Sequence, residues 1–77
     1  MALVYPNGKA LRELREKKVM SFFDVSRKAE LAGTTTIRKM EHGLPCRVET
    51  MRKVLAALDV DMADAYRFMS YEKPKEV

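Results

Sequence analysis

Apolar residues recur at every third or fourth position through most of the chain, which is the spacing of one face of an α-helix. This pattern predicts five short helices, at residues 10–18, 22–31, 34–41, 48–58 and 62–69. Turn-forming residues separate them: Asn7-Gly8 precedes the first helix, and Gly43 follows the third. No alternation of apolar and polar residues extends beyond three or four positions, so no strand is predicted. We therefore expect an all-α fold, a compact bundle of five short helices.

The length and composition indicate one small domain. Of the 77 residues 47% are hydrophobic, and the single cysteine, Cys46, excludes a disulfide within the chain. We place an extended lead at residues 1–8, the helical domain at 9–69 and a flexible polar tail at 70–77. No apolar stretch approaches the roughly 20 residues of a membrane-spanning helix. We therefore expect a cytoplasmic protein that does not associate with membranes.

Basic residues outnumber acidic ones and are unevenly placed. Fifteen Lys and Arg residues face eleven Asp and Glu residues, so the formal net charge is +4. Residues 9–18 carry +3 and residues 27–53 carry +4, whereas residues 59–77 carry −2. A basic surface around the central helices is typical of proteins that bind nucleic acid, although many small proteins share a basic balance.

The segment 34–41 has the composition of a helix that reads DNA. Ile37 and Met40 form an apolar face that would anchor the helix to the rest of the domain. The other face carries short hydroxyl groups and long cations that suit base edges: Thr34, Thr35, Arg38 and Lys39. Periodicity alone equally allows an ordinary amphipathic helix with a solvated polar face.

The start of the second helix is a further candidate site. Ser21 and Asp24 have the spacing of a capping box. The free N–H groups and the dipole at a helix N-terminus favour a phosphate, to which Ser21 could donate its hydroxyl. The carboxylate of Asp24 would oppose an anion at the same place.

Several stretches form a pattern that runs through nearly the whole chain: LRELRE at 11–16, MS at 20–21, VSRKA at 25–29, TIRKMEHG at 36–43 and VETMRKVLAALDV at 48–60. Together they resemble the Cro and phage-repressor type of helix-turn-helix family over about residues 9–69. The resemblance implies a lambda-repressor-like domain of five helices that binds a palindromic operator as a dimer. It also implies an ion pair between Arg15 and Glu41, which would orient the first helix against the third.

The same resemblance assigns roles to single residues. The positions that contact bases in the family fall on Thr34, Thr35 and Lys39, with Arg38 as a neighbouring basic candidate. The positions that contact phosphate fall on Ser21, Thr36, His42 and Arg47. The expected function is thus a sequence-specific DNA-binding transcriptional regulator, similar to a repressor, that docks one helix in the major groove.

The turn between the second and third helices departs from the family pattern. Glu30 stands where the family usually has a glycine in a left-handed conformation, which is costly for a residue with a side chain. The chain also has one residue more than the family between Ala29 and Ile37. We place the extra residue at Gly33 and expect this glycine to take over the turn.

Two adjacent aromatic residues open a different interpretation. Phe22 stands where the family often has a glutamine that contacts backbone or bases, and Phe23 follows it. At most one of the two rings can pack inward from one helix face. The other, exposed ring would contact a partner or be tolerated in solvent. The alternative function is a protein-interaction module of the antitoxin or phage control type, in which Phe22 and Phe23 make the contact.

Other candidate chemistry is weak. His42 and Cys46 are the only histidine and cysteine, whereas a zinc site needs about four ligands and a catalytic Cys–His pair needs a pocket. We expect no metal site, no cofactor and no enzymatic activity. The expected partners are double-stranded DNA, a second copy of the chain and a further protein. Met62, Tyr66 and Met69 either fill the core or face the second subunit.

Overall fold

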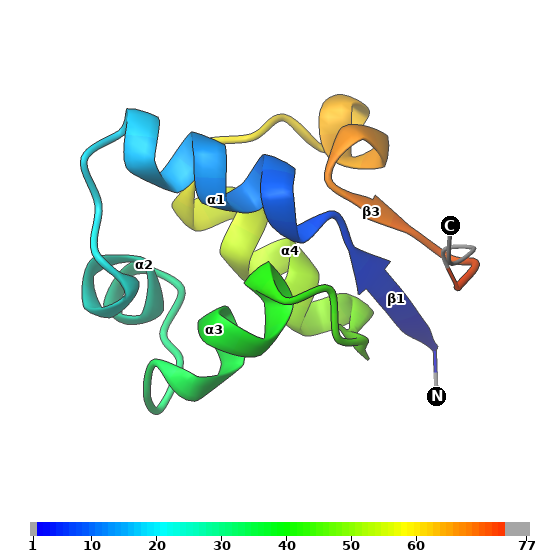
Figure 1. The fold of residues 1–77 in the computed structure, drawn as a ribbon, viewed down its shortest axis with the longest axis horizontal. Helices are drawn as coiled ribbons and strands as arrows, with labels where there is room; N and C mark the ends of the chain where they lie inside the picture. The colour runs from blue at the N-terminus through cyan, green and yellow to red at the C-terminus, as the bar shows by residue number, and fades with distance from the viewer. Residues whose placement is uncertain (1, 74–77) are drawn as a thin grey trace.

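Four α-helices, one 3-10 helix and three short strands make up the part of the chain that the computed structural model describes, residues 2–73. In chain order they are β1 (Leu3–Pro6), α1 (Gly8–Lys17), α2 (Phe22–Lys28), α3 (Thr35–Glu41), β2 (Cys46–Arg47), α4 (Val48–Ala57), the 3-10 helix η1 (Met62–Arg67) and β3 (Met69–Ser70). Figure 1 shows α2 at one end of the molecule and β1 and β3 at the other, with α1 and α4 between them. No helix within residues 2–73 is long and apolar enough to cross a membrane.

The three strands form one antiparallel sheet in the order β2-β1-β3. Val4 pairs with Cys46 on one side of β1, and Tyr5 pairs with Ser70 on the other. The sheet therefore joins the start of the chain to the loop after α3 and to the segment after η1. The expectation of an all-α bundle is wrong, because the fold combines helices with a sheet.

The strands escaped prediction because each is too short to show an alternating pattern. β1 has four residues, and β2 and β3 have two each. The strands that pair with one another lie far apart in the sequence, and no local pattern reveals such a pairing. Residues 1–8, expected as an extended lead, supply the central strand, and Ser70, expected in the tail, lies in β3. Residues 74–77 of the expected tail lie outside the described part of the chain.

The five helical segments that the apolar periodicity predicts are present, with shifted ends. Helix α1 begins at Gly8 because Asn7 caps it: the side-chain oxygen of Asn7 accepts from the N–H of Ala10 at 3.2 Å. The fifth segment is a 3-10 helix instead of an α-helix and ends at Arg67. Asp61 caps it by accepting from the N–H of Ala63 at 2.9 Å.

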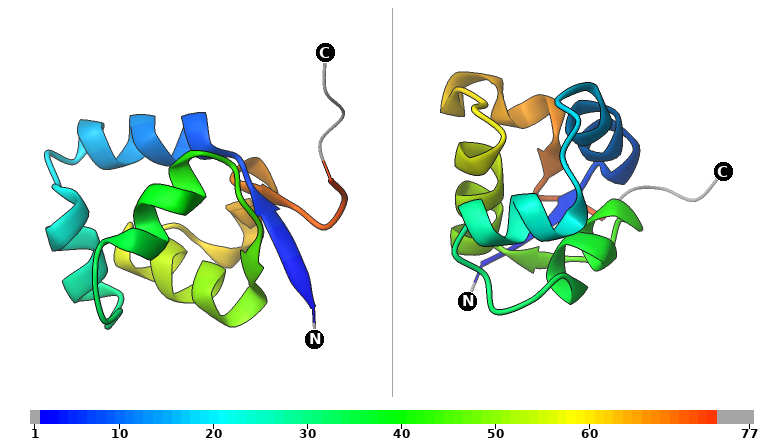
Figure 2. Two further views of the ribbon diagram at one scale, coloured as in Figure 1. Left: turned by 60° about the horizontal axis from the view of Figure 1, so that its bottom comes forward. Right: turned by 90° about the vertical axis from the view of Figure 1, so that its left-hand side faces the viewer.

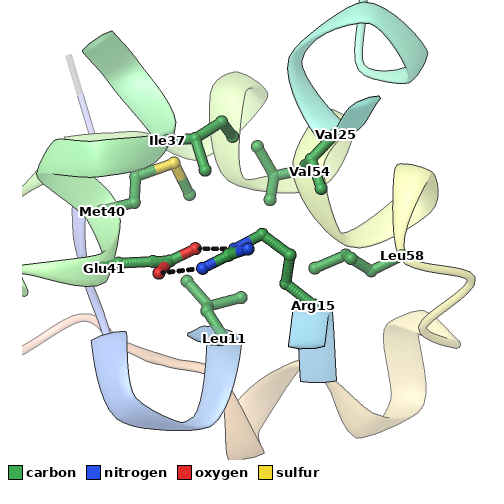
Figure 3. Close-up of a pocket in the computed structure, with 8 residues that line it drawn as sticks. All are labelled: Leu11, Arg15, Val25, Ile37, Met40, Glu41, Val54 and Leu58. Atoms are coloured by element: carbon green, nitrogen blue, oxygen red, sulfur yellow. Dashed lines mark hydrogen bonds and ion pairs between the residues drawn. The ribbon is translucent and has the colours of Figure 1, made fainter. Parts of the chain in front are cut away.

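One apolar core receives residues from all four α-helices and from β1. Its buried residues are Val4, Leu11, Val25, Ala29, Ile37, Met40, Met51, Val54, Leu55, Ala57 and Leu58. Where the four α-helices meet, the core encloses a cavity of ≈ 10 Å³ (Figure 3). This volume is no more than about one water molecule needs. Tight packing at this junction holds α3 firmly against the other helices.

Candidate nucleic-acid interface

Helices α2 and α3 are consecutive and lie side by side, joined by residues 29–34 (Figure 2). Helix α3 also packs on α1, and α2 also packs on α4. The connection is longer than the three or four residues that usually join the two helices of a helix-turn-helix unit. The orientation of α3 therefore depends on how α2 ends and on what holds α3 to α1.

The N-terminus of α2 carries the predicted capping box. The Ser21 hydroxyl accepts from the N–H of Asp24 at 3.0 Å, and the Asp24 carboxylate accepts from the N–H of Ser21 at 2.9 Å. The second of these hydrogen bonds is the main reason that the pKa of Asp24 is lowered. Ser21 is exposed and its hydroxyl proton is left to donate. It could therefore contact a phosphate, although the Asp24 charge beside it would weaken that contact.

The turn after α2 is made by Glu30, which has a left-handed conformation with a φ of 59°. The N–H of Glu30 donates to the carbonyl of Arg27 at 3.1 Å, and the N–H of Leu31 donates to that of Ser26 at 2.8 Å. These two bonds are a Schellman ending, which satisfies the last carbonyls of the helix. Gly33 does not have a positive φ, so the expectation that it takes over the turn is wrong. The hydrogen bonds that end α2 require the left-handed residue at position 30, before Gly33 is reached.

Helix α3 has a buried face and an exposed face. Ile37 and Met40 are 3% and 1% exposed and belong to the core. Thr34, just before the helix, is half-buried, and within residues 2–73 its hydroxyl makes no capping hydrogen bond. The other residues predicted to contact bases are exposed: Thr35, Arg38 and Lys39. The anchored face and the polar face thus lie where the sequence pattern places them.

Arg15 of α1 and Glu41 of α3 are paired as the family resemblance implies (Figure 3). Nε and Nη2 of Arg15 donate to the two carboxylate oxygens of Glu41 at 2.6 and 3.2 Å. Nη1 donates to the carbonyl oxygen of Met20 at 2.9 Å. The hydrogen bond to Glu41 is the main reason that the pKa of Arg15 is raised. With side chains only 12% and 8% exposed, the pair ties α1, the loop after it and the end of α3 together.

The two adjacent phenylalanines have different environments. Phe22 is half-buried and packs against the core. The guanidinium carbon of Arg15 lies 4.3 Å from its ring centroid and that of Arg38 lies 5.2 Å from it, so both can make cation–π contacts. Phe23 is 61% exposed, with the guanidinium carbon of Arg27 5.4 Å from its ring centroid. Of the two rings, only that of Phe23 is largely free for a partner.

A hollow of ≈ 430 Å³ opens between α1, α3 and the start of α2. We call it the arginine hollow; it is lined by Arg12, Arg15, Phe22, Arg38, Glu41 and His42. It brings His42, predicted to contact phosphate, beside Arg38, predicted to contact a base. The sequence did not single out Arg12. Its spacing of three from Arg15 places the two on neighbouring positions of α1, and this signal could have found it.

The remaining residues predicted to contact phosphate do not join this hollow. Ser21 lies at the N-terminus of α2, and Thr36 is half-buried in the first turn of α3. Arg47 is exposed and lies in β2, directly before α4. These residues would have to meet a ligand at separate points, as an extended nucleic-acid backbone allows.

The lone thiol is poorly placed for chemistry. Cys46 is half-buried in β2, and burial raises its pKa. A thiol with a raised pKa has little of the thiolate that acts as a nucleophile or metal ligand. Residues 2–73 contain no group of three or more His, Cys, Asp or Glu side chains that could hold a metal ion.

Comparisons with protein-family models, with curated proteins and with solved structures return no match for this chain. The residues and geometry of α1, α2 and α3 are therefore the basis of the function proposed below.

Proposed function

We propose that this protein is a sequence-specific DNA-binding transcriptional regulator of the repressor type, which acts as a homodimer in the cytoplasm. The two-faced construction of α3 carries the proposal. Ile37 and Met40 are buried, whereas Thr35 and Lys39, four residues apart, are exposed on one face. A short helix with an anchored apolar face and an exposed polar face is suited to the major groove of DNA.

Sequence would be read from the exposed face of α3. The hydroxyl and methyl groups of Thr35 can meet a base edge or a thymine methyl group, and Lys39 can donate to guanine. Thr34 lies at the N-terminal end of the helix, where its hydroxyl makes no cap within the described residues. The first residues of a recognition helix are those that usually reach base edges.

Affinity would come from contacts with the DNA backbone. The basic charge is concentrated in residues 9–18 and 27–53, which carry +3 and +4. Those of these side chains that meet phosphates release counterions and make binding depend steeply on salt. Ser21, Thr36, His42 and Arg47 are the residues proposed to contact phosphate. Regulation would follow from occupying an operator, with no reaction catalysed by the protein.

Selection of duplexes from a random library by the purified protein tests this proposal. We expect enrichment of a palindromic sequence whose half-sites are separated by about one helical turn, as two copies of the domain require. Sedimentation of the protein with the enriched duplex should give two protomers per duplex. Recovery of no preferred sequence after repeated rounds would contradict sequence-specific binding.

The exposure of Phe23 favours a second candidate, a protein-interaction module of the antitoxin or phage control type. Phe22 contributes less to this alternative, because its ring packs on the core and against Arg15 and Arg38. The Phe23→Ser variant separates the two functions. It should retain the DNA affinity of the parent if α3 reads DNA, whereas a pure interaction module would bind no duplex in either form.

A further inference from the structure

The arginine hollow combines three guanidinium groups with one carboxylate. Arg15 is already committed, because its three donor nitrogens bond to Glu41 and to the carbonyl of Met20. Together with the Phe22 ring, the Arg15–Glu41 pair therefore forms a fixed wall of the hollow and does not compete for a ligand. Arg12, Arg38 and His42 are the exposed polar residues of its lining.

Arg38 lines the hollow beside Phe22. Its guanidinium carbon lies 5.2 Å from the Phe22 ring centroid, a distance at which the ring and the cation attract. Among residues 2–73, no carboxylate lies within ion-pair distance of Arg38. Its positive charge is therefore available to an anion. Because the side chain lines the hollow, we expect it to meet the DNA backbone instead of a base edge.

Arg12 adds a second positive charge to the hollow, from α1. It is paired with Glu16 at 3.5 Å, but the two side chains are 65% and 54% exposed. An exposed pair of this kind stabilises little. A phosphate, which offers a stronger charge-assisted hydrogen bond, can draw Arg12 away from Glu16. His42, directly after α3, adds a ring nitrogen as a donor at the same hollow.

We infer that Arg12, Arg38 and His42 form a phosphate clamp that grips one phosphate group of the DNA backbone between α1 and α3. This inference rests on the proposed DNA-binding function and adds Arg12 to it. It also changes the role of Arg38, which holds the backbone and does not read a base. The Arg15–Glu41 pair sets the width of the clamp, since it joins the same two helices.

The clamp can be tested on DNA and on a free anion. The variants are Arg12→Gln and Arg38→Gln, with Arg52→Gln as the control, because Arg52 is an exposed arginine of α4 that lines a different hollow. Each variant removes one positive charge. Affinity is measured for a selected duplex and for a scrambled duplex at several salt concentrations. A second arm follows the NMR signals of Arg12, Arg38 and His42 as pyrophosphate is added to the parent protein.

The clamp predicts that Arg12→Gln and Arg38→Gln, each of which removes one contact from both protomers of the homodimer, weaken binding roughly 10- to 100-fold on both duplexes and lower the salt slope by about 2. Arg52→Gln should change neither quantity. Pyrophosphate should shift the three side-chain signals in the parent, and less so in the Arg38→Gln variant. These results support the clamp.

Other outcomes overturn it in distinguishable ways. If Arg38→Gln abolishes the preference for the selected duplex, Arg38 reads a base, and the proposed function stands without the clamp. If Arg52→Gln weakens binding as much as Arg12→Gln, only net charge matters and the clamp is rejected. If pyrophosphate shifts the three signals but no duplex binds, the site binds a free phosphate ligand. The assignment to the DNA backbone is then wrong, and so is the proposed function.

Discussion

The backbone of Glu41 lies directly against Gly8, so that a Cβ atom added at residue 8 would overlap the carbonyl group of Glu41. Glu41 thus contacts α1 at two points. Its backbone packs against Gly8, which has no side chain, and its carboxylate accepts hydrogen bonds from the guanidinium of Arg15. Neither contact belongs to the exposed face of α3. Both decide the angle at which that face is presented.

The substitution Gly8→Ala should destabilise the fold by about 2 kcal/mol, because either the start of α1 or the end of α3 must shift to admit the methyl group. Gly33→Ala is the matched control. A Cβ atom at residue 33 would meet nothing within 4 Å, and the φ there is not positive. This control should be neutral or stabilising by up to about 1 kcal/mol. Urea denaturation measures both, and equal midpoints for the two variants would rule out the close contact.

Removing either side of the Arg15–Glu41 pair should cost about 3 kcal/mol, because the remaining charge is left largely buried. Arg15→Ala also loses the hydrogen bond to the Met20 carbonyl, so it should be the more damaging of the two. The exposed pair of Arg12 and Glu16 offers a control: Arg12→Ala should cost no more than about 0.5 kcal/mol. A double-mutant cycle in urea should give a coupling well above that of the exposed pair. A coupling near zero would show that the pair does not join the two helices.

Three residues with side chains, Val19, Glu30 and Asp59, have left-handed conformations where glycine is favoured, and the first two end helices. Val19 ends α1 with a φ of 55°, and Glu30 ends α2 with a φ of 59°. Val19→Gly and Glu30→Gly should each stabilise the fold by about 1 kcal/mol, since a side chain is strained in this conformation. Val19 is 89% exposed, so little packing is lost. Ala32→Gly, at an exposed loop position without a positive φ, should instead destabilise slightly. Thermal denaturation in which Ala32→Gly is as stable as Val19→Gly or Glu30→Gly would contradict the strain.

The pKa of Asp24 gives the fold a dependence on pH. It is lowered from 3.8, chiefly by the hydrogen bond from the Ser21 N–H. Because the folded-state pKa is the lower one, the carboxylate stabilises the fold fully above pH 3.8, and this contribution is lost as the pH falls through the folded-state value. Asp24→Asn should therefore unfold at lower urea than the parent at neutral pH, and the difference should shrink below pH 3.8. A difference that stays constant in strong acid would show that the charge has no part in the cap.

Local hydrogen-bonding signals made much of the helical framework predictable. The spacing of Ser21 and Asp24 predicted the capping box, and Asn7 ahead of an apolar-periodic stretch indicated a cap. The sheet was not predictable in this way. Leu3 and Arg47 pair across the sheet although α1, α2 and α3 separate them in the sequence.

The details of the candidate site were only partly predictable. Apolar spacing placed Ile37 and Met40 inward and left Thr35 and Lys39 outward. The turn was harder, because the hydrogen bonds that end α2 outweigh the general preference for glycine and put Glu30 in the left-handed conformation. Arg12 was missed for a different reason. Its proposed role comes from a hollow shared by three helices, and a single-helix pattern does not show such a hollow.

The salt dependence of DNA binding tests the central claim most directly. The measurement is the fluorescence anisotropy of a labelled selected duplex with the parent protein and with Lys39→Ala. Two or three phosphate contacts per protomer, and so about four to six in the homodimer complex, should weaken binding of the parent by roughly 100- to 2,000-fold between about 50 and 200 mM salt. Lys39→Ala should reduce the preference for the selected over a scrambled duplex, which corresponds to about 1–3 kcal/mol for one base contact. If the parent protein binds no duplex even at about 50 mM salt, α3 is not a DNA-reading helix.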